Sequence, residues 1–325
     1  MKLNQVKGTA IWRLPGGNQI FTLDGTGGQD SFIIAPFERN GKVLCLKGTV
    51  TELTDADALL SSWRISVQGD TSSTSRETYI RWVNLATSEM AAGVLQKAVI
   101  ARRLWAQGGV SPAEMFSRLL GQHTNAFVYA FMLDDYGAMM GASPETLLRK
   151  KGSDLYTEAL GGTRTKGRYT EKEMHEHGHI ADYVQDILSV SGYNYQRKEK
   201  DVRQAGDVQH LLTGFTAGSK GTDKDLALVS ALHPTPAVCG LPVDAAGHFI
   251  SGTENFDRGF YTGFLGPMTA RGDFDFFVNL RCAEVYSNGL AVYAGAGLNS
   301  MSDPQDEWDE TSHKMRTILG AYRAD

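Results

Sequence analysis

The sequence has little of what marks secreted or membrane-spanning proteins. Only three cysteines (Cys45, Cys239 and Cys282) occur among 325 residues, and none of them forms a Cys-x-x-Cys pair. Such a sparse, odd set argues against a disulfide framework and favours buried thiols in a reducing compartment. Residues 1–15 lack the apolar core of a signal peptide, and the longest apolar run, residues 126–133, is too short to cross a bilayer. We therefore expect a soluble protein of the cytoplasm without a membrane partner.

Basic charge is also in short supply. The chain has 32 Lys and Arg against 37 Asp and Glu, which gives a formal net charge of −5, and it has no run of basic residues. A nucleic-acid surface needs clustered Lys and Arg to displace counterions, so the composition argues against that class and favours a small-molecule partner. Hydrophobic residues make up 42% of the chain and charged residues 21%, which supports a sizeable core and argues against disorder.

Short strands separated by glycine turns are predicted for the first seventy residues, and the polar stretch at 71–75 that follows is either a linker or a surface loop. Because later strands come in groups with helices between the groups, the pattern favours an α+β fold with largely antiparallel sheets over a doubly wound parallel sheet. The predicted helices are 78–96, 111–120, 170–189 and 303–322, and the predicted strands are 9–14, 19–23, 32–36, 43–46, 97–102, 126–133, 137–142, 146–150, 154–159, 263–265, 274–282 and 290–297.

Two of the predicted helices begin with a pair of glutamates three residues apart. Glu173 and Glu176 share one face of the first helix, and Glu307 and Glu310 share one face of the second. First-turn glutamates commonly interact with the helix dipole and stay solvated. If the two pairs converge, four carboxylates repel one another unless a divalent cation lies between them, and all-oxygen ligation suits Mg²⁺. Spacing alone does not show that the helices meet, so both interpretations stay open.

Lys97 and Glu145 are candidates for acid–base chemistry, and each has an ordinary alternative. Lys97 begins an apolar strand, where it is either exposed to solvent or desolvated with a lowered pKa that suits a base. Glu145 follows Gly-Ala-Ser-Pro between two strands, and in isolation it is more typical of a turn. Residues 161–164, Gly-Gly-Thr-Arg, form either an anion-binding loop or an ordinary turn. His233 opens His-Pro-Thr-Pro, a rigid turn that fixes the direction of its imidazole.

Taken together, these segments resemble the chorismate-utilising enzymes, a family of isochorismate, salicylate, anthranilate and aminodeoxychorismate synthases. The resemblance implies one catalytic domain over residues 1–325, with a motif-bearing core at 77–322 and a short divergent region at 1–76. It also implies two facing, largely antiparallel sheets flanked by helices, with the active site in the cleft between them. The matching stretches, in the family's order, are QKAVIAR (96–102), GASPE (141–145), EALGGT (158–163), EMHEH (173–177), HPTPAVCGLP (233–242), FYTG (260–263), VNLR (278–281), AGAG (294–297) and EWDET (307–311).

The resemblance assigns roles to individual residues. Lys97 matches the general base that activates water, and Glu145 matches the general acid that protonates the departing 4-hydroxyl group of chorismate. The positions that match substrate contacts are Gly162, Thr163, His233, Ala237, Tyr261, Arg281, Gly295, Gly297 and Lys314.

The resemblance also implies Mg²⁺ as a cofactor that holds the ring carboxylate of chorismate. Glu176 and Glu310 match the direct ligands, and Glu173 and Glu307 match secondary or water-mediated ligands. An ion at this place neutralises an anionic substrate and withdraws electrons from its ring.

Within the family, the residues most resemble isochorismate synthases. Members that add ammonia are expected to have Gln at position 97, so we expect no glutaminase partner. Val243 stands where salicylate synthases and ammonia-using relatives tend to have Lys, and the His-Pro-Thr-Pro-Ala form of residues 233–237 is typical of isochorismate synthases. We expect a monomeric isomerase that serves menaquinone or siderophore biosynthesis. The alternatives are a salicylate synthase, which goes on to eliminate pyruvate, and a catalytically idle relative that binds a carboxylate ligand.

Overall fold

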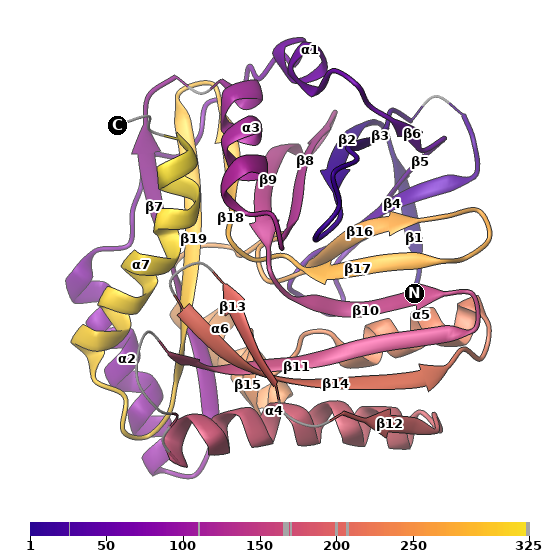
Figure 1. Ribbon diagram of the computed structural model, residues 1–325. Helices are drawn as coiled ribbons and strands as arrows, with labels where there is room; N and C mark the ends of the chain where they lie inside the picture. Colours follow the sequence, from indigo (N-terminus) through magenta and orange to yellow (C-terminus); the bar gives the residue numbers. More distant parts are fainter. Residues whose placement is uncertain are drawn as a thin grey trace.

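The computed structural model describes residues 1–25, 27–109, 111–164, 169, 171–198, 201–205 and 208–322, and it contains two large β-sheets that face each other (Figure 1). Helices cover the outer faces of both sheets. This arrangement confirms the predicted α+β fold of two facing, largely antiparallel sheets flanked by helices.

The first sheet, sheet A, takes strands from the start, the middle and the end of the chain. Its strands are β1 (Leu3–Val6), β4 (Asp30–Ala35), β5 (Val43–Gly48), β10 (Thr146–Lys151), β11 (Asp154–Arg164), β12 (Tyr195–Arg197), β13 (Asp201–Ala205), β14 (Val208–Gly218), β16 (Phe264–Met268) and β17 (Phe274–Val278). Their order is β1-β5-β4-β16-β17-β10-β11-β14-β12, and β13 pairs with β14.

The second sheet, sheet B, also combines distant parts of the chain. Its strands are β2 (Gly8–Arg13), β3 (Phe21–Leu23), β6 (Thr51–Glu52), β7 (Lys97–Gln107), β8 (Phe127–Leu133), β9 (Gly137–Ser143), β15 (Gly240–Leu241), β18 (Cys282–Tyr286) and β19 (Gly289–Leu298). Their order is β15-β7-β19-β18-β9-β8-β2-β3-β6. In the described parts of both sheets, only β1 and β5 pair in parallel.

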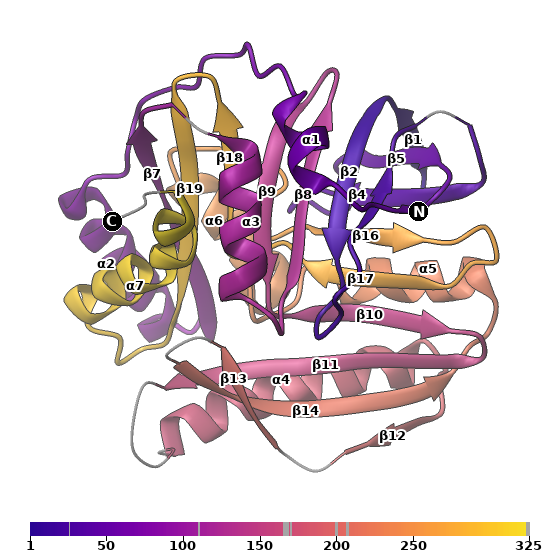
Figure 2. The same ribbon diagram turned by 45° about the horizontal axis from the view of Figure 1, so that its top comes forward.

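The helices divide between the two sheets (Figure 2). They are α1 (Ala56–Ser61), α2 (Arg76–Ala91), α3 (Pro112–Gln122), α4 (Glu171–Val190), α5 (Thr222–Leu232), α6 (Val243–Thr253) and α7 (Pro304–Tyr322). Helices α3 and α7 pack on sheet B, and α1 packs against α3. Helices α4 and α5 pack on sheet A, whereas α2 and α6 lie against β7. A helix long and apolar enough to cross a membrane is not found in the described part of the chain.

Aromatic side chains fill the space between the sheets. Phe127 of sheet B stacks on Phe277 of sheet A with ring centroids 4.2 Å apart, and Trp12 packs on Phe32 at 5.2 Å. All four residues are at most 1% exposed. Burying each such ring contributes roughly 1.5–3 kcal/mol of transfer free energy, so these contacts hold the two sheets face to face.

Two of the connections that carry the chain between the sheets lie next to each other. Pro144 and Glu145 connect β9 to β10, and residues 279–281 connect β17 to β18. The two crossings are bonded together, because Val278 N–H donates to Glu145 O over 3.0 Å and Ala142 N–H donates to Arg281 O over 3.0 Å. The single strand predicted at 274–282 is therefore wrong: it is two strands in different sheets.

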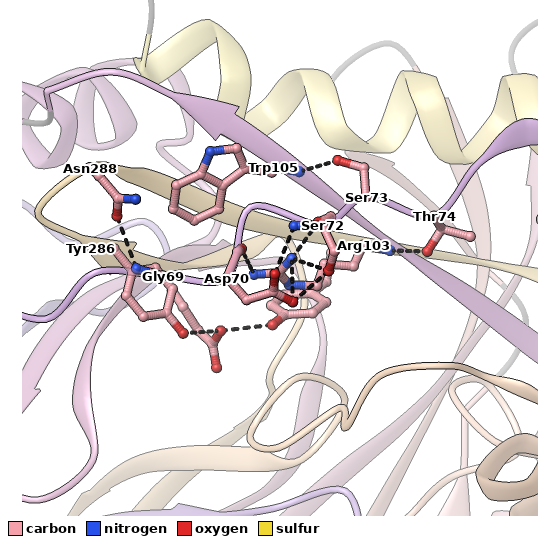
Figure 3. Close-up of polar contacts among 11 residues, drawn as sticks. Gly69, Asp70, Ser72, Ser73, Thr74, Arg103, Trp105, Tyr286 and Asn288 are labelled. Atoms are coloured by element: carbon pink, nitrogen blue, oxygen red, sulfur yellow. Dashed lines mark hydrogen bonds and ion pairs between the residues drawn. The ribbon is translucent and has the colours of Figure 1, made fainter.

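The polar stretch at 71–75 lies against the edge of β7 (Figure 3). Thr74 N–H donates to Arg103 O over 2.9 Å, and Ser73 Oγ accepts a hydrogen bond of 2.9 Å from Trp105 N–H. These bonds satisfy main-chain groups that an edge strand leaves unpaired. The stretch is thus a loop packed against β7.

The largest part of the fold that sequence patterns did not predict is residues 195–253, which form β12 to β15, α5 and α6. The residues from His210 to Phe215 in β14 are almost all buried, because the strand is covered on both faces. A strand covered on both faces does not alternate between apolar and polar residues, so it lacks the period-two pattern on which strand prediction depends.

Candidate active site

A pocket rich in charged side chains lies where the two sheets meet α4 and α7. Its lining includes residues of the two neighbouring crossings between the sheets, the start of β7 and the C-terminal half of β19. Its carboxylate, lysine, arginine and histidine side chains are Lys97, Glu145, Glu173, His210, Arg281, Glu307, Glu310 and Lys314. The other predicted site residues in the lining are Ala237, Tyr261, Gly295 and Gly297. The pocket therefore brings together both acid–base candidates and three of the four glutamates.

Lys97 is buried at the start of β7. The short strand β15 pairs with this end of β7, and Leu241 lies opposite Lys97 in the register. Gly240 approaches so closely that a Cβ atom built there lies 2.3 Å from the Lys97 carbonyl oxygen. Only a glycine fits at position 240. Lys97 itself is 7% exposed. The solvent-exposed alternative is thus excluded, and Lys97 faces the pocket with little access to water.

Glu145 is 5% exposed at the crossing between β9 and β10. Burial, together with the nearby carboxylate of Glu158, raises the pKa of Glu145 to about 8. Arg203, Lys97 and Lys314 act in the opposite direction and lower this pKa, but they do not overcome the burial. A carboxyl group with such a pKa is mostly protonated at neutral pH, so it can donate a proton to a leaving group.

The two acidic helices meet at the pocket. Glu173 of α4 lines it together with Glu307 and Glu310 of α7, whereas the side chain of Glu176 lies outside the described part of the structure. Among the side chains that are described, no group of three or more His, Cys, Asp or Glu is arranged to hold a metal ion. The acidic donors in the lining are nevertheless all carboxylate oxygens, which Mg²⁺ prefers, so the chemistry of the set fits that ion. The Mg²⁺ site itself stays a prediction.

Glu310 lies in a positively charged environment. Lys314 Nζ, one turn later on α7, lies 2.7 Å from Glu310 Oε1. Burial acts to raise the pKa of the Glu310 carboxyl group, but Lys314 outweighs it, with help from Arg281 and Lys97. The pKa of Glu310 therefore lies below its ordinary value, and the group is an anion at neutral pH. Lys314 also donates to Gly295 O over 2.9 Å and so ties α7 to β19.

Arg281 and Tyr261 form the part of the pocket that suits a carboxylate. Arg281, at φ 49°, donates from Nη1 to Thr317 Oγ1 of α7 over 2.8 Å. The Tyr261 ring stacks on Tyr293 at 5.3 Å, and burial raises the pKa of its hydroxyl group, which stays a neutral donor. A Cβ atom at Gly295 would lie 3.2 Å from the Tyr261 hydroxyl oxygen, so a side chain there would crowd this corner. An arginine fork can bind both oxygens of one carboxylate.

Three predicted substrate contacts are not placed in the described lining. His233 Nε2 lies 2.9 Å from Pro36 O, and burial lowers the pKa of this imidazole to about 4, so it stays neutral and braces the turn that it opens. Gly162, at φ 64°, lies against the main chain of Glu173, where a Cβ atom would come within 2.8 Å of the carbonyl oxygen. The side chain of Thr163 lies outside the described part of the structure.

Other lining residues were not predicted from the sequence. Tyr293 alternates with Gly295 and Gly297 along β19, so the period of two already places it on their face of the strand. Val238 follows the predicted Ala237 directly. His210 lies on β14, a strand without a periodic pattern, and the sequence held no signal for it.

Comparisons with known proteins agree with this geometry. A sequence model of the family described as chorismate binding enzyme matches residues 49–323. The vibriobactin-specific isochorismate synthase of Vibrio cholerae is 34% identical over 268 residues, which cover 77% of this chain and 68% of that protein. An isochorismate synthase of Bacillus subtilis is 34% identical over 274 residues, which cover 77% of this chain and 68% of that protein.

The fold also has solved counterparts. The structure of the menaquinone-specific isochorismate synthase from Escherichia coli superposes with a TM-score of 0.81 and 23% sequence identity, over 97% of this chain and 89% of that one. At this identity the likeness establishes the fold, and it agrees with the two facing sheets described above.

Proposed function

The chain belongs to the chorismate binding enzymes, and from this premise we propose that it is an isochorismate synthase, an isomerase that converts chorismate to isochorismate. The observation that carries the proposal is the meeting of Lys97 and Glu145 in one pocket. A buried lysine and a carboxyl group that is protonated at neutral pH are the base and the acid that an exchange of hydroxyl groups needs.

The proposed reaction uses the two residues in sequence. Lys97 acts as the base and takes a proton from a water molecule, and the oxygen of that water bonds to C2 of the ring. The ring double bonds shift, and the C4–oxygen bond breaks. Glu145 gives its proton to the departing hydroxyl group, which leaves as water. One water enters and one leaves, so the product is an isomer of the substrate, and solvent returns both residues to their starting protonation states.

The remaining lining residues suit the two carboxylates of chorismate. Arg281 and Tyr261 bind the enolpyruvyl carboxylate in this proposal, and Lys314 adds positive charge beside them. Gly295 and Gly297 leave room for the substrate along β19.

Glu173, Glu176, Glu307 and Glu310 would hold Mg²⁺. When bound, the ion would neutralise the ring carboxylate and withdraw electrons from the ring. The cation would offset part of the charge of these glutamates and so weaken their repulsion of an anionic substrate.

The reaction assay tests the proposal directly. Purified protein with chorismate and Mg²⁺ should give isochorismate, with no dependence on ammonia or glutamine, and it should elute as a monomer. Absence of turnover, or anthranilate formation with ammonia, contradicts the proposal. Salicylate and pyruvate as the major products at neutral pH would instead make the protein a salicylate synthase.

We assign the product to menaquinone or siderophore biosynthesis in the cytoplasm. Isochorismate released with its enolpyruvyl group intact is available to the next enzyme of either route. Deleting the gene separates the two routes: rescue by menaquinone indicates the first, and a growth defect confined to iron limitation indicates the second.

A further inference from the structure

A second buried carboxylate, that of Glu158 on β11, lies beside Glu145. Its side chain is 0% exposed and accepts four hydrogen bonds. Oε1 accepts from Thr146 N–H over 2.9 Å and from Nη1 of Arg203. Oε2 accepts from Nη2 of Arg203 over 2.8 Å and from the Tyr156 hydroxyl group over 2.9 Å. The lone pairs of this carboxylate are thus fully used by donors.

The Glu158–Arg203 ion pair is bonded to the main chain on both sides of Glu145. Glu158 accepts from the N–H group of Thr146, the residue after Glu145. Arg203 Nη1 donates over 3.2 Å to the carbonyl oxygen of Pro144, the residue before it. Both bonds involve a charged partner, which makes them stronger than bonds between neutral groups. The pair therefore holds the main chain of the crossing at the point where the acid is attached.

The same pair sets opposing charges next to the Glu145 carboxyl group. Glu158 raises the pKa of Glu145, and Arg203 lowers it. The other charged groups that act on Glu145 are Lys97 of β7 and Lys314 of α7, and both lower the pKa. The further titratable groups in the lining are Glu173, His210, Tyr261, Arg281, Tyr293, Glu307 and Glu310. Removing only one member of the ion pair leaves an unbalanced charge at this place.

We propose that Glu158 and Arg203 are positioning residues for Glu145, which fix the main chain around the acid and balance the charge beside it. The inference rests on the role proposed above for Glu145 as general acid. Neither residue needs to touch the substrate, because both act through Glu145.

The pH dependence of kcat tests this role. Glu158→Gln removes a negative charge and leaves Arg203 unpaired, so the pH at which activity falls on the alkaline side should drop by about one unit or more. This fall in activity at high pH is the alkaline limb of the pH profile. Arg203→Met removes the positive charge and should move the limb to higher pH. The double variant changes no net charge, and its limb should return toward that of the parent. A purely structural role would lower kcat equally at every pH and leave the limb in place.

Two further variants separate charge from packing. Asp225→Asn breaks another buried ion pair, in which Asp225 Oδ2 lies 3.0 Å from Lys150 Nζ, and Asp225 is 0% exposed. Neither of these residues is among the groups that shift the pKa of Glu145 most, so the control should lose stability without moving the limb. Arg203→Lys keeps the charge and should keep the limb near its parental pH, with a lower kcat because one bond to Pro144 or Glu158 is lost.

An infrared titration makes the result independent of turnover. The carbonyl band of the protonated Glu145 carboxyl group is identified as the band missing in Glu145→Gln, and its midpoint should shift in Glu158→Gln and Arg203→Met as the limbs do. If the infrared midpoint of Glu145 is unshifted in both variants, the inference is overturned, whatever the variants' turnover. Failure of the parent protein to convert chorismate overturns the proposed function, whereas a shifted infrared midpoint would still support the role of the ion pair.

Discussion

Glu145 and Glu310 are two glutamates in the lining of one pocket, and their surroundings shift their pKa values in opposite directions. The crossing between the sheets buries Glu145 beside Glu158, which raises the pKa of Glu145 to about 8. Helix α7 presents Glu310 next to Lys314, which holds the pKa of Glu310 below its ordinary value. One group is a proton donor at neutral pH, and the other is an anion that suits a cation. Burial acts to raise the pKa of both groups, and the balance of the neighbouring charges decides whether that rise persists.

The largest effect is expected at the acid itself. Glu145→Gln keeps the shape of the side chain and removes the proton, so kcat should fall by about 10²- to 10⁴-fold. Steady-state kinetics with chorismate measure the change, and unaltered chorismate binding shows that the pocket is intact. Retained turnover in this variant would mean that Glu145 is not the acid.

The next largest effect is expected at Glu310, the glutamate that is an anion at neutral pH. Glu310→Gln removes a proposed ligand charge, so the Mg²⁺ concentration for half-maximal activity should rise at least about tenfold, and removal of divalent cations with a chelator should stop turnover in the parent. The matched control is Glu114→Gln on α3, which breaks the exposed Glu114–Arg118 pair of 3.1 Å with the same spacing of four residues. An unchanged Mg²⁺ requirement in Glu310→Gln would contradict the assignment.

Stability should respond with opposite signs at the two glutamates. Glu145 has a pKa of about 8 in the folded protein against an ordinary value of 4.5, so folding takes up a proton between these values and stability falls as the pH rises through them. Glu145→Gln removes this cost and should raise the free energy of unfolding at pH 7 by on the order of 3 kcal/mol.

Glu310→Gln should do the reverse. Because the pKa of Glu310 is depressed, its carboxylate stabilises the fold above the ordinary value of 4.5, and this contribution is lost as the pH falls through the folded pKa. Denaturant unfolding at pH 5, 7 and 8 measures both variants. The comparison fails if both variants shift stability in the same direction at pH 7.

The smallest effect is expected at Thr317, which holds the Arg281 guanidinium by a bond of 2.8 Å. Thr317→Val removes the hydroxyl group and frees the arginine to move, so KM for chorismate should rise by about three- to tenfold while kcat stays near the parental value. A fall in kcat with unchanged KM would place Arg281 in the chemical step and outside substrate binding.

The two glutamates also differ in whether the sequence predicts their charged neighbours. Lys314 lies one helical turn after Glu310, so their contact follows from the helix alone. Glu158 and Arg203 come from different strands, and no local rule brings them to Glu145. Likewise, β14 gave no period-two pattern, because its residues from His210 to Phe215 are almost all buried, and His210 was missed with it.

Local pattern and motif thus determined the chemistry that the chain carries: the helices that present the glutamates, the strands that present Lys97 and the glycines, and the order of motifs that placed it among the chorismate binding enzymes. Only the tertiary structure decided which of these residues meet and in what protonation state. It split one predicted strand between two sheets, placed the His233 imidazole against the Pro36 carbonyl oxygen, and set Glu145 against Glu158. The physical reason is that helix and strand patterns depend on near neighbours in sequence, whereas burial and electrostatic potential depend on every group that folding brings within a few ångströms.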